Sequence, residues 1–125
     1  MLRCAEDGEL FLAFAEKIQS AEETQAYRYL IGWGAESAQY TCYPKRHGYI
    51  NSVRFYRGLA WEHSFIANQG WLTFYFRRPC LGFPKFARSA IVSRFPQAEE
   101  SNLGEFIVRV VSLEDAVRIA SYVES

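Results

Sequence analysis

Residues 49–79, YINSVRFYRGLAWEHSFIANQGWLTFYFRRP, decide the fold of this chain. Aromatic and β-branched residues fill three runs, which we predict to be strands over Tyr49–Tyr56, Leu59–Ala67 and Trp71–Arg77. Short segments that contain glycine separate the runs, which is typical of hairpin turns. The stretch therefore predicts three consecutive antiparallel strands.

Alternation with a period of two divides the side chains of these strands between two faces. One face is apolar, and the other mixes aromatic and basic side chains, as expected of a sheet face that is open to solvent or to a ligand. The mixed face takes Arg54, Tyr56, Trp71, Tyr75 and Arg77. In the middle strand the alternation fits either orientation, and the two aromatic residues favour Trp61 and Phe65 on the inner face.

Two helices are expected before the strands. Apolar residues recur at steps of three and four and predict an amphipathic helix over residues 8–19. Ser20 stands three residues before Glu23, which is the pattern of a capping box at the start of a second helix. Gly32 and Gly34 are expected to end that helix.

The rest of the chain alternates between short elements. Residues 39–43 indicate a short further strand, and Pro44–Gly48 is predicted to be a turn or loop. Pro84 is well placed as the first residue of a helix. The apolar run Glu105–Val111 predicts a strand inside the sheet, and Ser112 is expected to cap a final helix.

These elements predict an α+β fold. We expect a two-layer domain with a mainly antiparallel sheet of four to five strands, helices on one face and the order α-α-β-β-β-(β)-α-β-α. Residues 1–125 form a single domain in this prediction, with two acidic helices over 8–34, a basic aromatic sheet and helix over 39–95, and a strand and helix over 105–124. The order of elements resembles that of small two-layer domains, frataxin-like ones among them, but it comes without motif residues that would carry a function over.

Charge is segregated along a chain whose formal net charge is zero. Residues 1–40 and 95–125 each carry a net charge of −4, and residues 41–94 carry +8. An overall pI near 6.7 conceals this separation. The basic middle segment therefore favours an anionic partner.

Composition limits the class of protein. Half of the residues are apolar and 22% are charged, which suits a folded domain with one core. No run approaches the ~18 apolar residues of a membrane span, and acids stand where a signal peptide has its apolar region. We therefore expect a cytoplasmic protein without a membrane partner. Cys4, Cys42 and Cys80 are widely spaced and predict reduced thiols, not a disulfide framework.

Catalytic motifs are scarce. The sequence contains no phosphate-binding glycine loop, no Gly-x-Ser-x-Gly elbow and no metal-site spacing, so we predict neither a metal nor a cofactor. Glu62, His63 and His47 are weak candidates for acid–base chemistry, of the kind that a metal-independent ribonuclease needs. Neighbouring strand residues point to opposite faces, so Glu62 and His63 share a pocket only if a bulge intervenes.

Binding has a better physical basis than catalysis. Clustered Lys and Arg displace counterions from a phosphate backbone, and exposed rings stack on unpaired bases. The candidate binding residues are Arg54, Tyr56, Trp71, Tyr75, Arg77, Arg78, Lys45, Arg46, Lys85 and Arg88. We predict a non-enzymatic binding protein whose sheet face engages an anionic partner, either nucleic acid or a complex that handles it.

Alternative functions stay open at this point. A small phage or mobile-element inhibitor of a host defence complex, of the anti-CRISPR type, would use the same Tyr, Trp and Arg side chains for protein–protein contact. A metal-independent ribonuclease would use the acid–base candidates. In a purely structural interpretation, the rings belong to the core and the arginines pair with the acidic helices. An exposed aromatic face would also suit a homodimer.

Overall fold

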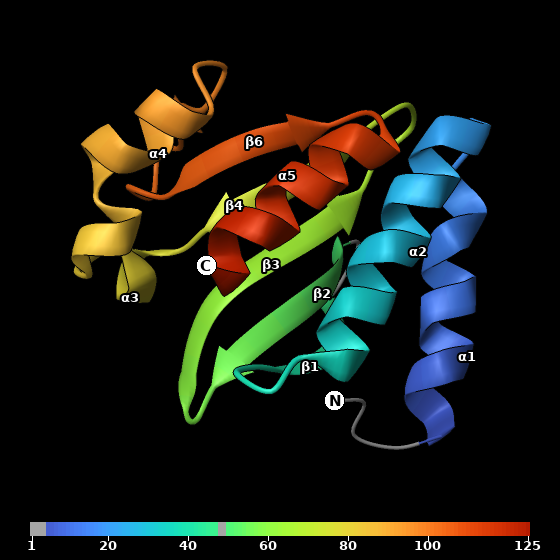
Figure 1. Cartoon of the computed structure of the whole chain (residues 1–125). Helices are drawn as coiled ribbons and strands as arrows, with labels where there is room; N and C mark the ends of the chain where they lie inside the picture. The colour runs from blue at the N-terminus through green and yellow to red at the C-terminus, as the bar shows by residue number, and fades with distance from the viewer. Residues whose placement is uncertain (1–4, 48–49) are drawn as a thin grey trace.

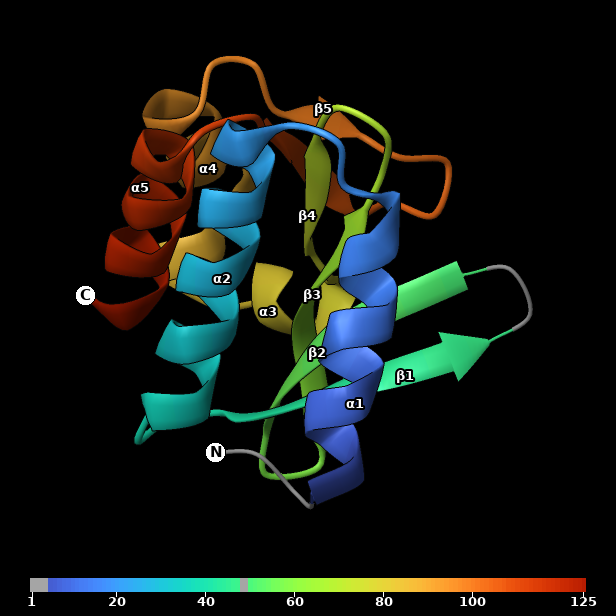
Figure 2. The same cartoon turned by 90° about the vertical axis from the view of Figure 1, so that its right-hand side faces the viewer.

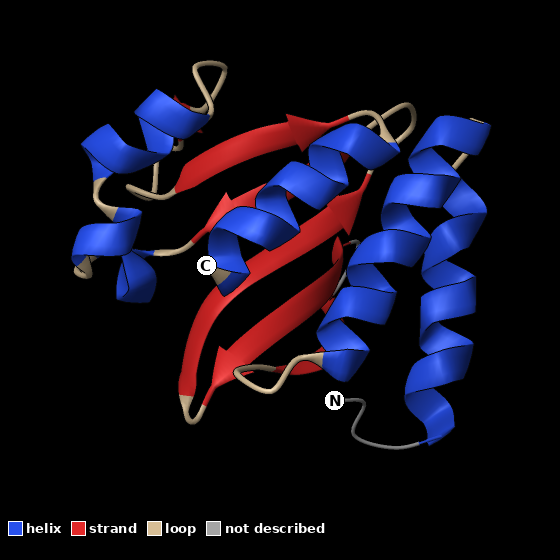
Figure 3. Cartoon of the chain, in the orientation of Figure 1, coloured by secondary structure: helices blue, strands red, loops and turns tan. Residues whose placement is uncertain are grey.

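The computed structural model describes the backbone of residues 5–47 and 50–125 and the side chains of residues 8–46 and 51–125. The helices are α1 (Ala5–Phe14), α2 (Ala21–Glu36), α3 (Arg78–Leu81), α4 (Arg88–Arg94) and α5 (Leu113–Glu124), with 3-10 helices η1 (Ala15–Lys17) and η2 (Pro84–Phe86). The strands are β1 (Thr41–His47), β2 (Ile50–Arg57), β3 (Ala60–Ala67), β4 (Leu72–Phe76), β5 (Glu99–Glu100) and β6 (Phe106–Val110). Together they form the α+β fold that the sequence predicts (Figure 3).

The strands form one sheet in the order β1-β2-β3-β4-β6-β5, and every neighbouring pair is antiparallel. The three central strands of the prediction are β2, β3 and β4, which pair in sequence order. The sheet has six strands where four to five are expected, because β5 lies in a segment predicted to be a loop. Two residues are too few to leave a hydrophobic pattern in a sequence.

The first strand also departs from the prediction. β1 continues through Pro44 to His47, where a turn or loop is expected. It lies at the edge of the sheet, and an edge strand tolerates proline because an amide that points away from the neighbouring strand is not needed for pairing. Gly48 and Tyr49, which include the predicted start of the next strand, lie outside the described residues.

Helices cover one face of the sheet. α2 and α5 lie side by side across this face, and α1 lies next to α2 towards β1 (Figures 1 and 2). Fully buried phenylalanine rings fill the inner face, among them Phe65, which the alternation places there: Phe55, Phe65, Phe74 and Phe76. Figure 2 shows the sheet from its edge, and none of the described helices packs on its other face.

Serine caps begin α2 and α5 as predicted. Ser20 Oγ accepts a hydrogen bond from Glu23 N at 3.0 Å, and Ser112 Oγ accepts one from Asp115 N at 3.3 Å. The Glu23 carboxylate does not complete a capping box, because its Oε1 accepts instead from Gly70 N at 3.0 Å. Glu23 therefore ties α2 to the turn between β3 and β4.

Gly32 and Gly34 lie inside α2, although the sequence predicts that they end it. A Cβ atom on Gly34 would come within 2.6 Å of Phe55 Cε1 and 2.8 Å of Cys42 Sγ. The glycine is therefore needed where the helix approaches β1 and β2, and it does not serve as a helix terminator.

The segment predicted as one helix from Pro84 is divided in two. Pro84 begins η2, and extended backbone at Ala87, with a ψ of 149°, separates η2 from α4. The ring of Phe86 anchors this break by packing against His63 and Tyr122. Within the part of the chain that the structure describes, none of the helices has both the length and the apolar character to cross a bilayer.

Candidate binding face of the sheet

The sheet face opposite the helices, which we call the open face, carries small and polar side chains between larger ones. Strand pairing aligns residues of β2, β3, β4 and β6 across this face in two adjacent rows. The first row is Arg54, Ser64, Tyr75 and Ile107, and the second is Ser52, Ile66, Thr73 and Arg109. The rows show that residues from four strands share one surface.

A β-bulge between β2 and β3 decides which side chains reach the open face. Phe55 pairs with His63, but Tyr56 pairs with Trp61, so Glu62 is an extra residue on β3. The bulge turns Trp61 to the open face beside Tyr56, and it leaves Glu62 and His63 together on the inner side. The expectation that Trp61 lies inside is therefore wrong.

Aromatic rings and guanidinium groups form a stacked cluster on the open face. The ring of Tyr56 stacks on those of Tyr43 and Trp61, with centroids 5.2 and 6.2 Å apart. The guanidinium carbons of Arg54 and Arg77 lie 3.8 and 3.6 Å from the Trp61 ring centroid. A guanidinium that stacks on a ring keeps its N–H edge for hydrogen bonds to an anion. The cluster therefore offers fixed hydrogen-bond donors at the surface.

The two arginines differ in their other partners. Arg77 Nε lies 3.2 Å from Glu105 Oε2, and its Nη1 donates to the Trp61 carbonyl oxygen at 2.7 Å. Arg54 Nε donates to Ser52 Oγ at 3.3 Å, and no carboxylate pairs with it among the described residues. Arg54 thus contributes positive charge that the protein does not neutralise locally.

The pKa of Tyr56 depends on its neighbours in this cluster. Burial raises its pKa, but hydrogen bonding to Tyr43 and Arg54 and the charges of Arg54 and Arg77 outweigh burial, so the pKa of Tyr56 lies below its ordinary value. The phenolate form is stabilised by the hydrogen bond to Tyr43 and by the two guanidinium groups. The same surroundings favour phosphate or carboxylate groups of a partner.

Two grooves hollow the open face and share Ile66 and Tyr75. The first, which we call the arginine groove, has a volume of about 420 Å³ and is lined by Ser52, Arg54, Trp61, Ser64, Arg77 and Glu105. The second, the Trp71 groove, has a volume of about 710 Å³ and is lined by Asn68, Trp71, Thr73, Gln97, Glu99 and Arg109. Volumes of this order suit a small molecule or one segment of a polymer.

The ring of Trp71 is held in place in its groove. Its Nε1 donates to Thr73 Oγ1 at 3.1 Å, and Asn68 Nδ2 donates to the same oxygen at 2.8 Å. The guanidinium carbon of Arg109 lies 4.4 Å from the ring centroid. Trp71 is predicted on the same face as Arg54, and the structure places it there but in the neighbouring groove.

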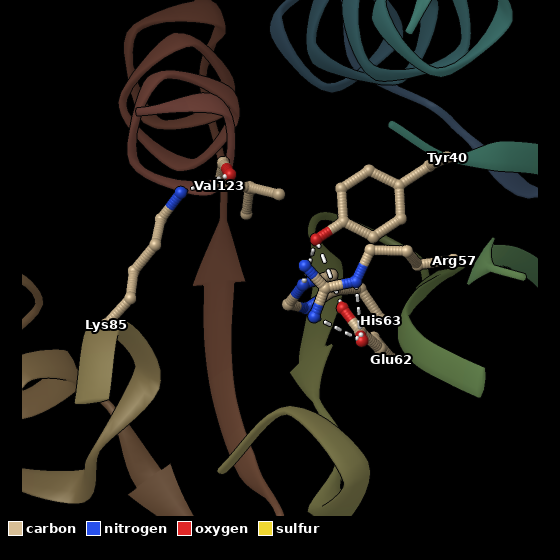
Figure 4. A network of polar contacts seen from close by, with 6 residues as sticks. All are labelled: Tyr40, Arg57, Glu62, His63, Lys85 and Val123. Carbon is tan, nitrogen blue, oxygen red and sulfur yellow. Dashed lines mark hydrogen bonds and ion pairs between the residues drawn. The ribbon is translucent and has the colours of Figure 1, made fainter. Parts of the chain in front are cut away.

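Three predicted binding residues, on α3, η2 and α4, do not line either groove. Lys85 Nζ donates to the Val123 carbonyl oxygen at 2.6 Å, which ties η2 to the end of α5 (Figure 4). Arg88 pairs with Glu100 at 3.1 Å. Arg78 is an exposed residue of α3. The structure does not bring these side chains together with Arg54.

The two predicted basic residues of β1 lie on opposite faces of the sheet. Lys45 is exposed and pairs in register with Ser52, at the margin of the open face. Arg46 donates from Nε to Asn51 Oδ1 at 3.3 Å and lies over the Phe14 ring of α1. Lys45 therefore adds charge to the open face, whereas Arg46 belongs to the helix side.

A buried polar cluster lies behind the bulge on the inner side of the sheet (Figure 4). Glu62 Oε2 pairs with Arg57 Nη2 at 2.7 Å, and Glu62 Oε1 accepts from the Tyr40 hydroxyl at 3.2 Å. The same hydroxyl lies 3.4 Å from His63 Nε2. The bulge therefore brings Glu62 and His63 together, which the sequence leaves conditional.

The surroundings of this cluster suit packing better than acid–base chemistry. His63 is fully buried, and burial lowers its pKa to about 3, so the ring is neutral near pH 7. Burial, followed by the charge of Glu62, raises the pKa of Tyr40. The side chain of His47, the third candidate, lies outside the described residues.

Among the described residues, thiols and metal ligands form no further candidate site. Cys42 and Cys80 are buried and form no disulfide with each other, and burial raises the pKa of Cys80 to about 12, while Cys4 lies outside the described residues. Among the side chains that are described, three or more metal-ligating groups do not come together. That the three cysteines are reduced thiols stays a prediction from the sequence.

Several residues of the open face were not predicted as binding residues. Arg109 had a sequence signal, because it is the charged residue in the middle of an apolar strand. Ser64 had a weaker one, since alternation sets it on the opposite face from Phe65. Trp61 had none, because its orientation follows from the bulge.

Comparison with protein-family models, with curated proteins and with solved structures finds no match to this chain.

Proposed function

We propose that this protein is a non-enzymatic binding protein that holds nucleic acid on its open face. The observation that carries the proposal is the placement of two guanidinium groups, those of Arg54 and Arg77, 3.8 and 3.6 Å from the ring of Trp61 on a solvent-facing sheet. Guanidinium groups held in this way match phosphate oxygens in charge and in hydrogen-bond geometry.

The balance of charge on the open face also supports an anionic ligand. Arg54 and Arg109 have no carboxylate partner within the described part of the chain, and Lys45 is exposed at the margin. Glu105 is already paired with Arg77. Binding of a phosphate backbone would neutralise the remaining positive charges and release counterions.

The burial of the acid–base candidates Glu62 and His63 fits a binding protein better than an enzyme. Glu62 is 2% exposed and His63 is 0% exposed, and both carboxylate oxygens of Glu62 and Nε2 of His63 have partners within the buried cluster. A general acid or base must come within hydrogen-bond reach of a substrate. On the open face, in contrast, Lys45 and Arg109 are exposed and Arg54 is half-buried.

The proposal is tested by fluorescence anisotropy with labelled oligonucleotides over a salt series. Arg54→Gln removes one positive charge from the open face, and Arg28→Gln removes one from an exposed position of α2 on the helix side. We expect Arg54→Gln to weaken binding and to reduce the slope of log K against log salt by about 0.7, the contribution of one phosphate contact to a single strand. Arg28→Gln should leave both quantities close to those of the native protein.

Equal effects of the two substitutions would show that binding is non-specific electrostatics and would refute a role for the open face. Absence of salt-dependent binding to any nucleic acid would refute the proposal itself. If that absence were accompanied by a stable protein partner whose capture depends on Arg54, the inhibitor alternative would take its place.

A further inference from the structure

The floor of the arginine groove contains a hydroxyl group without a partner. Ser64 is 4% exposed and lines this groove directly opposite Arg54 in the strand pairing. Its hydroxyl makes no hydrogen bond within the described part of the chain. The buried side-chain atoms that lack a partner among the described residues are Glu23 Oε2 and His63 Nδ1, so the Ser64 oxygen is accessible to solvent or to a ligand in the groove. A phosphate oxygen held by Arg54 would accept a hydrogen bond from this hydroxyl.

The Trp71 groove offers different chemistry. It combines the ring of Trp71, over one face of which the Arg109 guanidinium lies, with the side-chain amides of Asn68 and Gln97 and the carboxylate of Glu99. Gln97 and Glu99 are exposed and have no side-chain partner among the described residues. An aromatic surface beside amide and carboxylate groups is the combination that proteins use to stack an unpaired base and to hydrogen-bond its edge.

The two grooves form one continuous surface. They share Ile66 and Tyr75, and Arg54 on β2 lies three strand spacings from Arg109 on β6, about 14 Å across the sheet. A base in a duplex has its faces stacked and its edge paired, so it cannot enter a groove of this kind. An unpaired base can enter while its own backbone stays beside the arginines.

We infer that the open face selects single-stranded nucleic acid by seating one unpaired base in the Trp71 groove and an adjoining phosphate in the arginine groove. This inference rests on the proposed function and adds the class of nucleic acid and the division of labour between the grooves. Trp71 and Gln97 contact the base, and Arg54 and Ser64 contact the phosphate.

The test compares labelled probes about ten nucleotides long, within the range of known single-strand sites. The probes are an intact single strand, a strand of the same length with abasic residues, and a duplex of the same sequence. The native protein should bind the intact strand about tenfold more tightly than the abasic strand, the loss expected when stacking on one ring is removed. The duplex should bind no better than the abasic strand.

Substitutions test which side chains contact the base and which contact the phosphate. Trp71→Leu should lower the affinity for the intact strand to that for the abasic strand and leave the affinity for the abasic strand unchanged. Trp71→Phe keeps a stacking ring and should retain most of the preference for the intact strand. Gln97→Ala changes an exposed side chain and should reduce the preference even if Trp71→Leu proves unstable. Arg54→Gln should lower the affinities for the intact and the abasic strand by the same factor.

The outcomes separate this inference from the proposed function. If the intact and abasic strands bind with equal affinity and Arg54→Gln weakens the binding of both, nucleic acid binds the open face. The seating of a base in the Trp71 groove is then refuted. Tighter binding of the duplex, or an unchanged preference in both Gln97→Ala and the Trp71 variants, also overturns the inference. Failure of every probe to bind overturns the inference and the proposed function together.

Discussion

Replacement of His63 by phenylalanine should remove a loss of stability that the native protein undergoes in mild acid. His63 is fully buried against the rings of Phe74, Phe76 and Phe86. Burial lowers its pKa to about 3, whereas the pKa in an unfolded chain is ~6.5. Below ~6.5 the unfolded chain therefore binds a proton that the folded protein excludes, so the free energy of unfolding decreases as the pH falls.

The size of this effect follows from proton linkage. Each pH unit well below ~6.5 costs about 1.4 kcal/mol, and the total between about pH 7.5 and about pH 5 is about 2 kcal/mol. Arg57 and Lys85 act in the same direction, because their charges also disfavour a protonated His63. The substitution leaves the Tyr40 hydroxyl its bond to Glu62 at 3.2 Å, so it creates no unpaired polar group there.

The assay is urea unfolding followed by circular dichroism at several pH values for both proteins. The free energy of unfolding of the native protein should fall by about 2 kcal/mol more than that of His63→Phe over this range. All other titrating groups are common to both proteins and cancel in the comparison. Parallel pH profiles would refute a buried neutral histidine at this position.

Three further substitutions test the contacts of α2. Gly34→Ala should destabilise the protein by about 1–3 kcal/mol, because the new Cβ would lie 2.6 Å from Phe55 Cε1. Gly32→Ala in the same helix is the control: its Cβ meets nothing within 4 Å, so it should stabilise the protein by about 0.5–1 kcal/mol. Equal melting temperatures for the two variants would contradict the close approach of α2 to the sheet. Glu23→Gln should become more stable relative to the native protein as the pH rises above ~4.5, because burial raises the pKa of Glu23 and makes its charge unfavourable. A difference in stability between Glu23→Gln and the native protein that does not change with pH would exclude this effect.

Features that depend on local residue patterns could be predicted from the sequence. Ser112 was expected to begin a helix because a serine cap satisfies a free amide close by in the chain, and α5 begins there. The alternation placed Phe65 on the inner face and Arg54 on the outer one, and both lie there. The extension of β1 through Pro44 could not be predicted, because it depends on the strand lying at the edge of the sheet.

The open face was only partly predictable for the same reason. Arg54 and Tyr75 follow the simple alternation of their strands, so both were placed correctly. Trp61 was not, because an extra residue in β3 reverses its orientation and strand alternation contains no signal for that residue. The grooves depend on which residues of different strands come into register, and this is a property of the folded sheet.

The bulge links the two faces of the sheet. Because Glu62 is the extra residue, it turns inward, where its carboxylate requires Arg57 and Tyr40 as partners. The same irregularity turns Trp61 outward, where its ring receives the guanidinium groups of Arg54 and Arg77. The buried cluster is therefore part of what positions the stacked cluster of rings and guanidinium groups on the open face, and Glu62 has a structural reason to be where it is.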